Sequence, residues 1–594
     1  MCAIAGEISF NKNATNKNTV NMLDEMLHRG PDGRGLYFHK NLSMGMNRLA
    51  IVDLTTGDQP LYNEDKSVVV VGNGEIYNYP ELQKKLKKKG HGLKSGSDIE
   101  TVVHLYEDYG QNFVKYLRGM FALALYDKNK NRLILARDRI GEKPLYYSSA
   151  EDGIYFASEL KALLKVPQTN KTVSKKRLVE YFHYAYINDP NTIFSNIHRI
   201  PQASVMTIDI SRRSQSIKKY WHVPKTDKVL HKNITSEIED TIKYASVINS
   251  RADVPVGISL SGGIDSTSVL AFTANTKKHK PTTSFSVGYA GHPKTDERDK
   301  AKRTAKHYAI QNFDVELSPN DFVRDYPKIV RYSDEPVADL AAYPIYSVAK
   351  MCRSKKIKVL LGGLGGDELF WGYPWVNKVT TDYFKSGTVD SFNLYLQGPT
   401  FKRCLMFTKR LFTKEAKEIS SKIPSPSTTD IHSKIDVGRE SIRELLKGWL
   451  AANCLTLADR LGMANSVEMR SPLIDYKLVE LAYRSQENIT AYDKSPKFWM
   501  KKALKNILPI EVLSRKKQGF TPPVANWLPG LFKKYINLLN DGYLVQEGVL
   551  DANRVKLLSF TWRAVPIYWE AIYHVLTLEI WCRIYIWGQK TKDL

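Results

Sequence analysis

The sequence predicts a two-domain protein of mixed α/β and α+β class. Its 594 residues exceed what one hydrophobic core usually supports. Residues 118–127 and 135–147 read as apolar strands joined by charged turns. Residues 256–268 form an apolar run that enters a Ser/Gly-rich turn and continues as a helical pattern, as the units of a parallel α/β sheet do. We therefore expect domains at residues 2–210 and 220–594.

Cys2 is the residue that most strongly indicates a particular chemistry. After removal of Met1, one residue would carry both a thiol and a free α-amine. An α-amine has an unperturbed pKa of about 7.7 to 8.0, so it can take the thiol proton near neutrality and return it to a leaving amine. A cysteine considered alone is more often structural than catalytic. The motifs that follow favour the catalytic interpretation.

Residues 72–78 supply groups that acyl chemistry on an amide requires. The Asn73 amide and the Gly74 N–H can form an oxyanion hole, and Glu75 can receive an ammonium group. Asp98 adds a second acid. Considered singly, an Asn-Gly pair is more often a hairpin turn and Asp98 more often a surface charge.

Residues 28–33 read as a tight turn, and residues 47–53 place Arg48 beside an apolar strand that includes Ile51 and Val52. There the guanidinium can hold a carboxylate with two parallel hydrogen bonds. A single arginine is otherwise more often a surface charge.

In this order and nearly intact, the motifs resemble those of the class II glutamine amidotransferases. The resemblance implies an N-terminal-nucleophile hydrolase domain with an αββα sandwich, in which Cys2 attacks the side-chain amide of glutamine and ammonia is released. It implies that Asn73 and Gly74 hold the oxyanion, and that Arg29 and Met120 lie near an ammonia exit. The glutamine-binding residues it implies are Arg48, Ile51, Val52, Asn73, Gly74, Glu75 and Asp98.

The turn at residues 261–266, SGGIDS, has the geometry of a phosphate site. Backbone N–H groups and a helix N-terminus can converge there on an anion. No Gly-Lys-Ser/Thr follows, so it is not a Walker loop, and a glycine-rich turn alone is often a mere tight connection. The motif resembles the pyrophosphate loop of enzymes that split ATP into AMP and pyrophosphate to adenylate an acceptor.

Residues 358–373 repeat the arrangement of strand, glycine turn and acids, and make Asp367 and Glu368 candidate active-site residues. Residues 454–475 and 496–503 are similar to motifs of the asparagine synthetases, and Lys497 is that family's lysine. The ATP-binding residues that the resemblance implies are Leu260, Ser261, Gly262, Gly263, Asp265, Ser266, Val287, Gly362, Gly363 and Lys497. It implies an acceptor or adenylate site at Asp339, Asp367 and Glu368, and Mg²⁺ at Asp265 and Asp367.

The resemblance covers nearly the whole chain and implies a glutamine-dependent asparagine synthetase. Glutamine hydrolysis at Cys2, with Asn73 and Gly74 assisting catalysis, would supply ammonia through an internal passage to a carboxylate adenylated with Mg-ATP. In the adenylation, Lys497 would stabilise charge on the transferring phosphates. One loop departs from the family pattern, because Gly362 replaces a serine and Leu364 replaces an acid. We expect aspartate as acceptor, with a nucleotide-linked uronate of bacterial surface-polysaccharide biosynthesis as the alternative.

Five cysteines, an odd number without paired spacing or a CxxC motif, indicate a reducing compartment, which we take to be the cytoplasm, and we expect no secretory signal. The net charge of +25 invites a nucleic-acid or membrane interpretation. However, the densest lysine run, residues 84–89, is typical of a solvated helix face, and no nucleic-acid motif accompanies it.

The aromatic stretch at residues 567–587 is interrupted by charges at nearly helical spacing. It predicts a packed terminal helix rather than a membrane span, and leaves peripheral membrane contact as a minority interpretation. Residues 424–429 predict an exposed loop. The expected partners are therefore small molecules, and a homodimer is left open.

Overall fold

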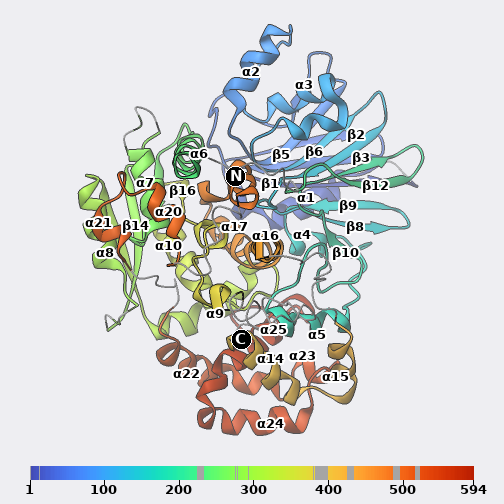
Figure 1. The fold of residues 1–594 in the computed structure, drawn as a ribbon. Helices are drawn as coiled ribbons and strands as arrows, with labels where there is room; N and C mark the ends of the chain where they lie inside the picture. The colour runs from blue at the N-terminus through green and yellow to red at the C-terminus, as the bar shows by residue number, and fades with distance from the viewer. Residues whose placement is uncertain are drawn as a thin grey trace.

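The computed structural model describes most of the chain (Figure 1). The described residues are 2–11, 14–223, 233–274, 276, 279–291, 293, 295–378, 380, 399–423, 434–485, 495–515 and 522–594. Met1 and the loop expected at residues 424–429 lie outside them. Figure 1 shows a β-rich half in blue and cyan beside a green half built on a parallel sheet, with red and ochre helices below both.

Two six-stranded sheets form the first half, and all their strand pairs are antiparallel. The first sheet has the order β10 (Ile197–Arg199), β8 (Tyr146–Ala150), β9 (Gly153–Ala157), β1 (Ala3–Ser9), β3 (Leu42–Arg48) and β2 (Gly33–His39). The second has the order β12 (Ser214–Lys219), β11 (Ser204–Asp209), β7 (Arg132–Arg137), β6 (Gly119–Asp127), β5 (Val68–Ile76) and β4 (Leu61–Tyr62). Because β12 pairs with β11, this sheet extends past residue 210.

Side-chain alternation explains how the sheets are buried. Ile4 and Ile8 of β1 enter an apolar cluster shared by the two sheets, whereas Ala3 and Ala5 belong to the cluster of the outer helices. Against the first sheet lie α1 (Asn16–Glu25) and α4 (Leu160–Leu163), and against the second lie α2 (Tyr79–Lys88) and α3 (Glu100–Tyr109). This confirms the predicted αββα sandwich.

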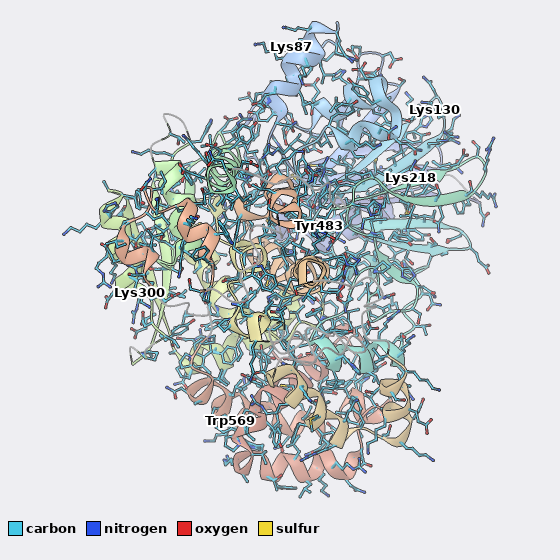
Figure 2. The ribbon with its side chains drawn as sticks, viewed as in Figure 1. Lys87, Lys130, Lys218, Lys300, Tyr483 and Trp569 are labelled. Carbon is cyan, nitrogen blue, oxygen red and sulfur yellow. The ribbon has the colours of Figure 1, made fainter. Side chains whose placement is uncertain are left out.

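The lysine run lies on α2 as predicted. Leu82 and Leu86 are buried, while Lys84, Lys85 and residues 87–89 are exposed. Figure 2 shows Lys87 near the tip of this helix, and Lys130, Lys218 and Lys300 at separate places on the outline. The basic residues labelled there are therefore dispersed.

The second half is built on a five-stranded sheet with parallel pairing throughout. Its order is β15 (Gln311–Leu317), β14 (Thr283–Tyr289), β13 (Val256–Ser259), β16 (Val359–Leu361) and β17 (Glu468–Arg470). The chain runs from β13 outward to β15 and then returns to the other side of β13, so the strand order reverses between β13 and β16. Open α/β sheets bind ligands at this kind of position, outside the carboxyl ends of the strands.

Helices surround this sheet and extend below it (Figure 1). The helices up to the second glycine loop are α6 (Ile234–Asn249), α7 (Ile264–Ala274), α8 (Arg298–His307), α9 (Pro319–Ser333), α10 (Ala342–Ser354) and α11 (Gly366–Leu369). Those that follow are α14 (Pro399–Leu411), α15 (Lys414–Ser421), α16 (Lys434–Glu444), the π-helix η3 (Leu445–Leu455), α17 (Thr456–Met463), α18 (Tyr476–Arg484), α20 (Phe498–Ala503), α21 (Ile510–Leu513), α22 (Val524–Tyr535), α23 (Tyr543–Gln546), α24 (Ala552–Thr561) and α25 (Trp569–Tyr585).

Helix α25 is packed inside the molecule, as the sequence predicts. Its residues from Ala571 to Ile584 are almost all buried. Glu579 accepts hydrogen bonds from the N–H groups of Tyr543 and Leu544, and pairs with Arg583 at 3.0 Å. Among the described residues, no helix combines the length and apolarity that crossing a bilayer requires.

Candidate functional site

Cys2 lies just before the central strand β1 and is 6% exposed. Its backbone nitrogen donates to Asn73 Oδ1 at 3.0 Å, and its carbonyl oxygen accepts from Arg29 Nε at 3.2 Å. Burial raises the pKa of the Cys2 thiol, while the Leu49 N–H and the Arg48 guanidinium act in the opposite direction. The thiol therefore depends on a nearby base to become a nucleophile.

Asn73 and Gly74 lie on strand β5 facing Cys2, rather than in the hairpin turn that an Asn-Gly pair alone favours. The Asn73 side chain is fully buried, and its Nδ2 has no hydrogen-bond partner in the described part of the chain. Gly74 has φ +142°, and a Cβ there would lie 2.0 Å from the Met120 carbonyl oxygen. The site therefore keeps a buried N–H donor free, as an oxyanion hole requires.

Glu75 and Asp98 are both buried near this site. Burial raises the pKa of Asp98 to about 6, although it accepts a hydrogen bond from the Ile76 N–H at 2.7 Å. Burial also raises the pKa of Glu75 well above its usual range, against the effect of Arg470. An incoming ammonium group would stabilise the charged form of both carboxylates. Binding such a group is the role that the family resemblance implies for them.

Arg470 and Glu468, to which the sequence pattern assigned no role, reach this site from strand β17 of the other half. Arg470 Nη2 lies 3.4 Å from Glu75 Oε1, and Arg470 Nε donates to Glu468 Oε1 at 2.5 Å. Both side chains are fully buried. Two opposite charges at alternate positions of a short strand are a signal in the sequence, but it does not identify a partner more than 390 residues away.

Arg48 lies at the end of β3, beside the segment that contains Ile51 and Val52, as predicted. Its guanidinium donates to Asp58 Oδ1 at 2.8 Å and to the carbonyl oxygens of Val52 and Asp53. These contacts hold the Arg48 side chain, which is 8% exposed, in one orientation.

The phosphate-loop motif follows strand β13 and begins helix α7, as predicted. Leu260 is buried and its N–H donates to the Phe285 carbonyl of β14, one strand away from the loop. Ser261 Oγ lies 3.2 Å from Ser266 Oγ and accepts from the Gly263 N–H at 3.2 Å. Gly262 has φ +72°, which favours glycine. The loop is thus closed by its own serines.

Lys497 joins the two glycine loops of the second half. Its Nζ forms ion pairs with Asp265 and with Asp367, the latter at 2.7 Å. Burial disfavours the charged amine, but the two carboxylates outweigh it and raise the pKa of Lys497. Gly363 and Gly366 permit this approach, because a Cβ at either would overlap the Asp265 side chain. The predicted ATP and metal residues therefore converge on one point.

Glu368 and Asp339 lie close to that point. Burial, Glu368 and Asp339 together raise the pKa of the nearby Cys454 thiol. Glu368 Oε1 accepts from Tyr373 Oη at 2.7 Å, and burial with the neighbouring Asp367 raises the pKa of Glu368 to about 7. Asp339 Oδ2 accepts from Asn453 Nδ2 at 2.8 Å.

The remaining predicted positions occupy the same edge of the sheet. Val287 is buried on β14, and the Gly362 N–H after β16 donates to the Arg470 carbonyl at 2.8 Å. Leu364 packs against the apolar cluster beneath the loop. The departure from the family pattern thus leaves an aliphatic group at this position of the loop.

Two arginines connect the halves between the sites. Arg29, fully buried, donates from its guanidinium to Glu159 and to both carboxylate oxygens of Asp459 on α17 while it holds the Cys2 carbonyl. Arg118 donates to the two oxygens of Asp475, both at 2.8 Å. A cavity of about 20 Å³ lies at this interface. Its lining includes Tyr77, Gly119, Asp138, Arg139, Glu142, Asn249, Asp475 and Tyr476.

The chain matches the family model of a glutamine amidotransferase domain over residues 1–221 and that of asparagine synthase over residues 237–583. It is 31% identical to glutamine-hydrolyzing asparagine synthetase 1 of Bacillus subtilis (strain 168), over 93% of this chain and 91% of the relative. Glutamine-hydrolyzing asparagine synthetase 3 of the same organism is 29% identical, over 98% and 99%.

Amidase chry2 of Gibberella zeae is 26% identical over 89% of this chain and 88% of its own. A solved structure of the allosteric regulatory enzyme of purine biosynthesis is a weaker likeness, with a TM-score of 0.30 and 14% identity over 52% of this chain and 64% of its own. Two adjoining family matches and a relative aligned over nearly its whole length show that this chain belongs to the glutamine-dependent asparagine synthetase family, and that it is an enzyme that forms an amide with the use of ATP.

Proposed function

We propose that the enzyme releases ammonia from glutamine at Cys2 and transfers it to the adenylated side-chain carboxylate of aspartate. The products are asparagine, glutamate, AMP and pyrophosphate. The observation that carries the proposal is the pairing of Cys2 with Asn73, which binds the Cys2 backbone through Oδ1 and keeps a buried Nδ2 donor free.

In the glutaminase step, the α-amine of Cys2 takes the thiol proton and the thiolate attacks the glutamine amide carbon. The oxyanion is held by Asn73 Nδ2 and the Gly74 N–H. The amine returns the proton to the leaving ammonia, and water then frees glutamate from the thioester. Glu75 and Asp98 bind the substrate ammonium, and Arg48 with the Ile51–Val52 backbone binds its carboxylate.

In the synthetase step, the acceptor carboxylate attacks the α-phosphorus of ATP and pyrophosphate leaves. The backbone N–H groups of residues 261–266 and Lys497 hold the negative charge of the phosphates. Asp265 and Asp367 already share one cation, Lys497, and offer the carboxylate oxygens that Mg²⁺ prefers. When bound there, Mg²⁺ would neutralise the charge that develops on the pyrophosphate.

Ammonia then reaches the adenylate without entering bulk water. The interface cavity of about 20 Å³ has room for one molecule of the size of water or ammonia. Glu368, with a pKa of about 7, can accept a proton from ammonia as it attacks the acyl carbon. This step would take place in the cytoplasm, in keeping with free cysteines at Cys2, Cys352, Cys404, Cys454 and Cys582.

Leu364 supports a second acceptor class, a nucleotide-linked uronate. Its aliphatic side chain stands where the asparagine synthetase pattern has an acid, and it packs into the core beneath the loop. The likeness to a protein named as an amidase also shows that the same two-part plan is not confined to relatives named as asparagine synthetases.

Replacement of Cys2 tests whether glutamine hydrolysis and amide formation take place at separate sites. Cys2→Ala should abolish glutamate release from glutamine, because Cys2 supplies the thiolate. The same variant should still form AMP and amide when ammonium chloride replaces glutamine. Cys352→Ala, a buried cysteine remote from this chemistry, is the control. Persistent glutaminase activity in Cys2→Ala would contradict the assignment.

A screen of carboxylates with glutamine and ATP identifies the acceptor. Aspartate should stimulate conversion of ATP to AMP and yield asparagine by mass spectrometry. Nucleotide-linked uronates should give no amide. An amide from a uronate, with none from aspartate, would replace the first acceptor by the second.

A further inference from the structure

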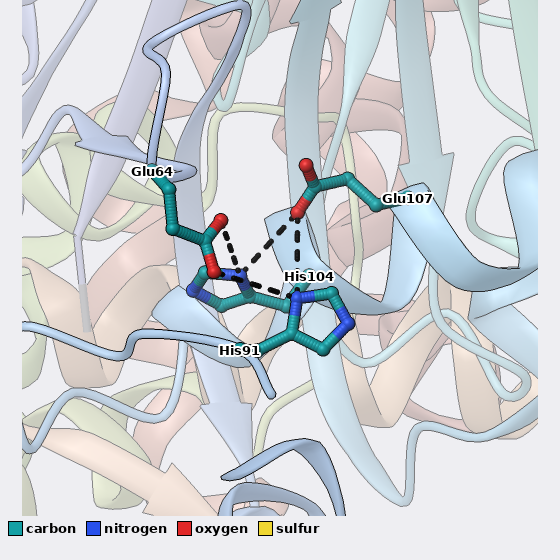
Figure 3. Close-up of side chains that lie close together, drawn as sticks. All are labelled: Glu64, His91, His104 and Glu107. Carbon is teal, nitrogen blue, oxygen red and sulfur yellow. Dashed lines mark ion pairs between the residues drawn. The ribbon is translucent and has the colours of Figure 1, made fainter. Parts of the chain in front are cut away.

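A cluster of four side chains, Glu64, His91, His104 and Glu107, lies on the outer side of the glutaminase half, apart from both candidate sites (Figure 3). Glu64 comes from the turn between β4 and β5, and His91 from the segment after α2. His104 and Glu107 are three positions apart on α3, so they share one face of that helix. One ligand atom from each residue lies within 4.8 Å of all the others.

Three distances within one set of four donor atoms lie near the edge length of a tetrahedral metal site. His104 Nδ1 lies 3.4 Å from both Glu64 Oε2 and Glu107 Oε2, and His91 Nδ1 lies 3.7 Å from Glu107 Oε2. His91 Nδ1 also lies 3.5 Å from the other oxygen of Glu64, Oε1. Donors placed about 2.0–2.1 Å from a tetrahedral Zn²⁺ are separated by about 3.3 Å. The contacts are also longer than ordinary hydrogen bonds, so the groups face one another without being joined.

His104 gives an independent reason to expect a ligand. Its side chain is fully buried, and within the described part of the chain neither ring nitrogen makes a hydrogen bond of ordinary geometry: Nδ1 faces the two glutamates, and Nε2 lies 3.9 Å from Glu100 Oε1. A buried polar group whose hydrogen bonds are not made is costly. Nδ1 of this ring is directed at the two glutamates (Figure 3).

Neighbouring groups fix the ligands in place, as outer-shell partners of metal sites do. Asn63 Nδ2 donates to Glu107 Oε1 at 2.8 Å, and the Gly92 N–H donates to Glu64 Oε1 at 2.7 Å. The other ring nitrogen of His91 lies 3.3 Å from Asp108 Oδ1. With these contacts made, Glu64 and Glu107 each keep one carboxylate oxygen directed to the centre of the cluster, and His91 keeps one ring nitrogen.

The field at the centre attracts a cation. Glu64 and Glu107 face His104 Nδ1 at 3.4 Å, and Glu100 Oε1 lies 3.9 Å from His104 Nε2, so three carboxylates surround this ring. An imidazolium ion in the cluster is therefore the rival explanation, and it differs from a metal site in measurable ways.

We propose that Glu64, His91, His104 and Glu107 form a structural binding site for a divalent transition metal, with Zn²⁺ as the preferred ion. Two imidazole nitrogens and two carboxylate oxygens suit Zn²⁺ better than Mg²⁺ or Ca²⁺, which favour all-oxygen sites. All four positions are filled by protein, which is typical of a structural rather than a catalytic zinc site.

The site connects to glutamine binding through the segment that carries Asp98. Glu100 accepts from the N–H groups of Lys94 and Ser95, both at 2.7 Å, so the segment after His91 is held against α3. Asp98 follows at once and accepts from the Ile76 N–H on β5. The metal pins His91 to α3 and thereby shortens the free length of chain before Asp98.

Metal analysis of the full-length enzyme tests the proposal. After dialysis against a chelator and reconstitution with Zn²⁺, elemental analysis should find one equivalent of zinc that a large excess of Mg²⁺ does not displace. Zinc should also raise the thermal midpoint of unfolding, because an ion that binds only the folded state stabilises it. Failure to retain zinc above the level of the variant His91→Gln would overturn the site.

A variant series separates ligands from bystanders. Asp108→Asn should weaken zinc binding roughly 10–100-fold, as loss of an outer-shell partner does, and His91→Gln or Glu107→Gln should weaken it more. His39→Gln, on the same half but outside the cluster, is the matched control and should bind zinc like the unmodified enzyme. Equal zinc binding by His91→Gln and His39→Gln would contradict the assignment.

Substitution with Co²⁺ gives a readout independent of folding and of activity. The complex should show the visible absorption of tetrahedral Co²⁺ without a sulfur-to-cobalt band, which excludes binding at Cys2. The variant Cys2→Ala should give the same spectrum. A sulfur band would place the metal at a cysteine, and no visible absorption would favour the imidazolium explanation. Either result would reject the metal site.

Discussion

Asn73 uses its amide group in two directions. Its oxygen holds the Cys2 backbone, and its nitrogen stays buried without a partner where the oxyanion forms. We predict that Asn73→Ala lowers the glutaminase kcat by roughly 10²–10³-fold, the effect of losing one oxyanion donor, with a smaller change in KM for glutamine. Steady-state glutamate release measures both constants.

Asn41→Ala is the matched control for this change, because Asn41 hydrogen bonds to the Ser9 carbonyl at the far end of β1. It should leave kcat unchanged. A fall in kcat of similar size in both variants would indicate general loss of structure rather than loss of the donor.

Asp98 predicts a pH dependence of glutamine binding. Burial and Glu468 raise its pKa to about 6, while the Ile76 and Ile99 N–H groups and Arg470 lower it. The carboxylate that binds ammonium is therefore present above pH 6 and lost as the pH falls through this value. KM for glutamine should rise about tenfold per pH unit below that point.

Asp98→Asn should raise KM at pH 8 and flatten this acidic limb, which steady-state kinetics from pH 5 to 8 would reveal. An unchanged acidic limb in Asp98→Asn would assign the titration to another group, of which Glu75 is the nearest candidate.

At the scale of single residues, the sequence predicts functional residues that belong to contiguous motifs. It does not predict contacts between residues that are far apart in the chain. Cys2, Asn73 and Lys497 could be identified because each belongs to a short pattern with its own chemistry. Arg470 could not be assigned, because its partner Glu75 belongs to a different sheet and the contact depends on how the two halves meet. The zinc cluster was missed for the same reason, since its residues come from three separate segments.

At the scale of elements, strand β17 links the two candidate sites. Its Arg470 pairs with Glu75 of the glutamine site, and its backbone carbonyl accepts from the Gly362 N–H of the synthetase loop. Arg470→Ala should destabilise the protein by ~3–5 kcal/mol, because it leaves buried carboxylates without their cation. Urea-induced unfolding followed by fluorescence would measure the loss.

The double variant Glu468→Gln with Arg470→Met tests the electrostatic origin of that effect. It removes a buried charge together with its partner and should recover part of the lost stability. A double variant less stable than Arg470→Ala would show that shape, rather than charge, sets the cost.

The elements themselves were largely predictable, because hydrophobic periodicity and glycine turns are local. Residues 118–127 correspond closely to β6, and residues 567–587 contain α25. The π-helix η3 was not predicted, because its extra residue per turn leaves no distinct pattern in an apolar stretch. The strand position of Asn73 and Gly74 was not predicted, because turn propensity favours a hairpin turn for an Asn-Gly pair.

At the scale of the whole molecule, the interface between the halves should retain ammonia. Arg118 forms two hydrogen bonds with Asp475, and its guanidinium lies 4.5 Å from the centre of the Tyr244 ring. Arg118→Met should loosen the wall of the interface cavity, so that glutamate forms in excess over amide product. Parallel assays of glutamate and amide measure this ratio.

Arg34→Met is the matched control, since Arg34 pairs with Asp24 on the surface of the first half alone. Its two products should remain equimolar. Equimolar products in Arg118→Met as well would place the ammonia route elsewhere.

The burial of α25 has a consequence for synthesis on the ribosome. Tyr181 donates its hydroxyl to the His574 carbonyl of α25, and the ring centre of Phe194 lies 6.0 Å from that of Trp581. Roughly 390 residues separate these partners, which corresponds to ~20–80 s of translation. During that interval the apolar surface around Phe194 lacks the helix that covers it in the finished protein, so the nascent polypeptide exposes part of its core until α25 docks.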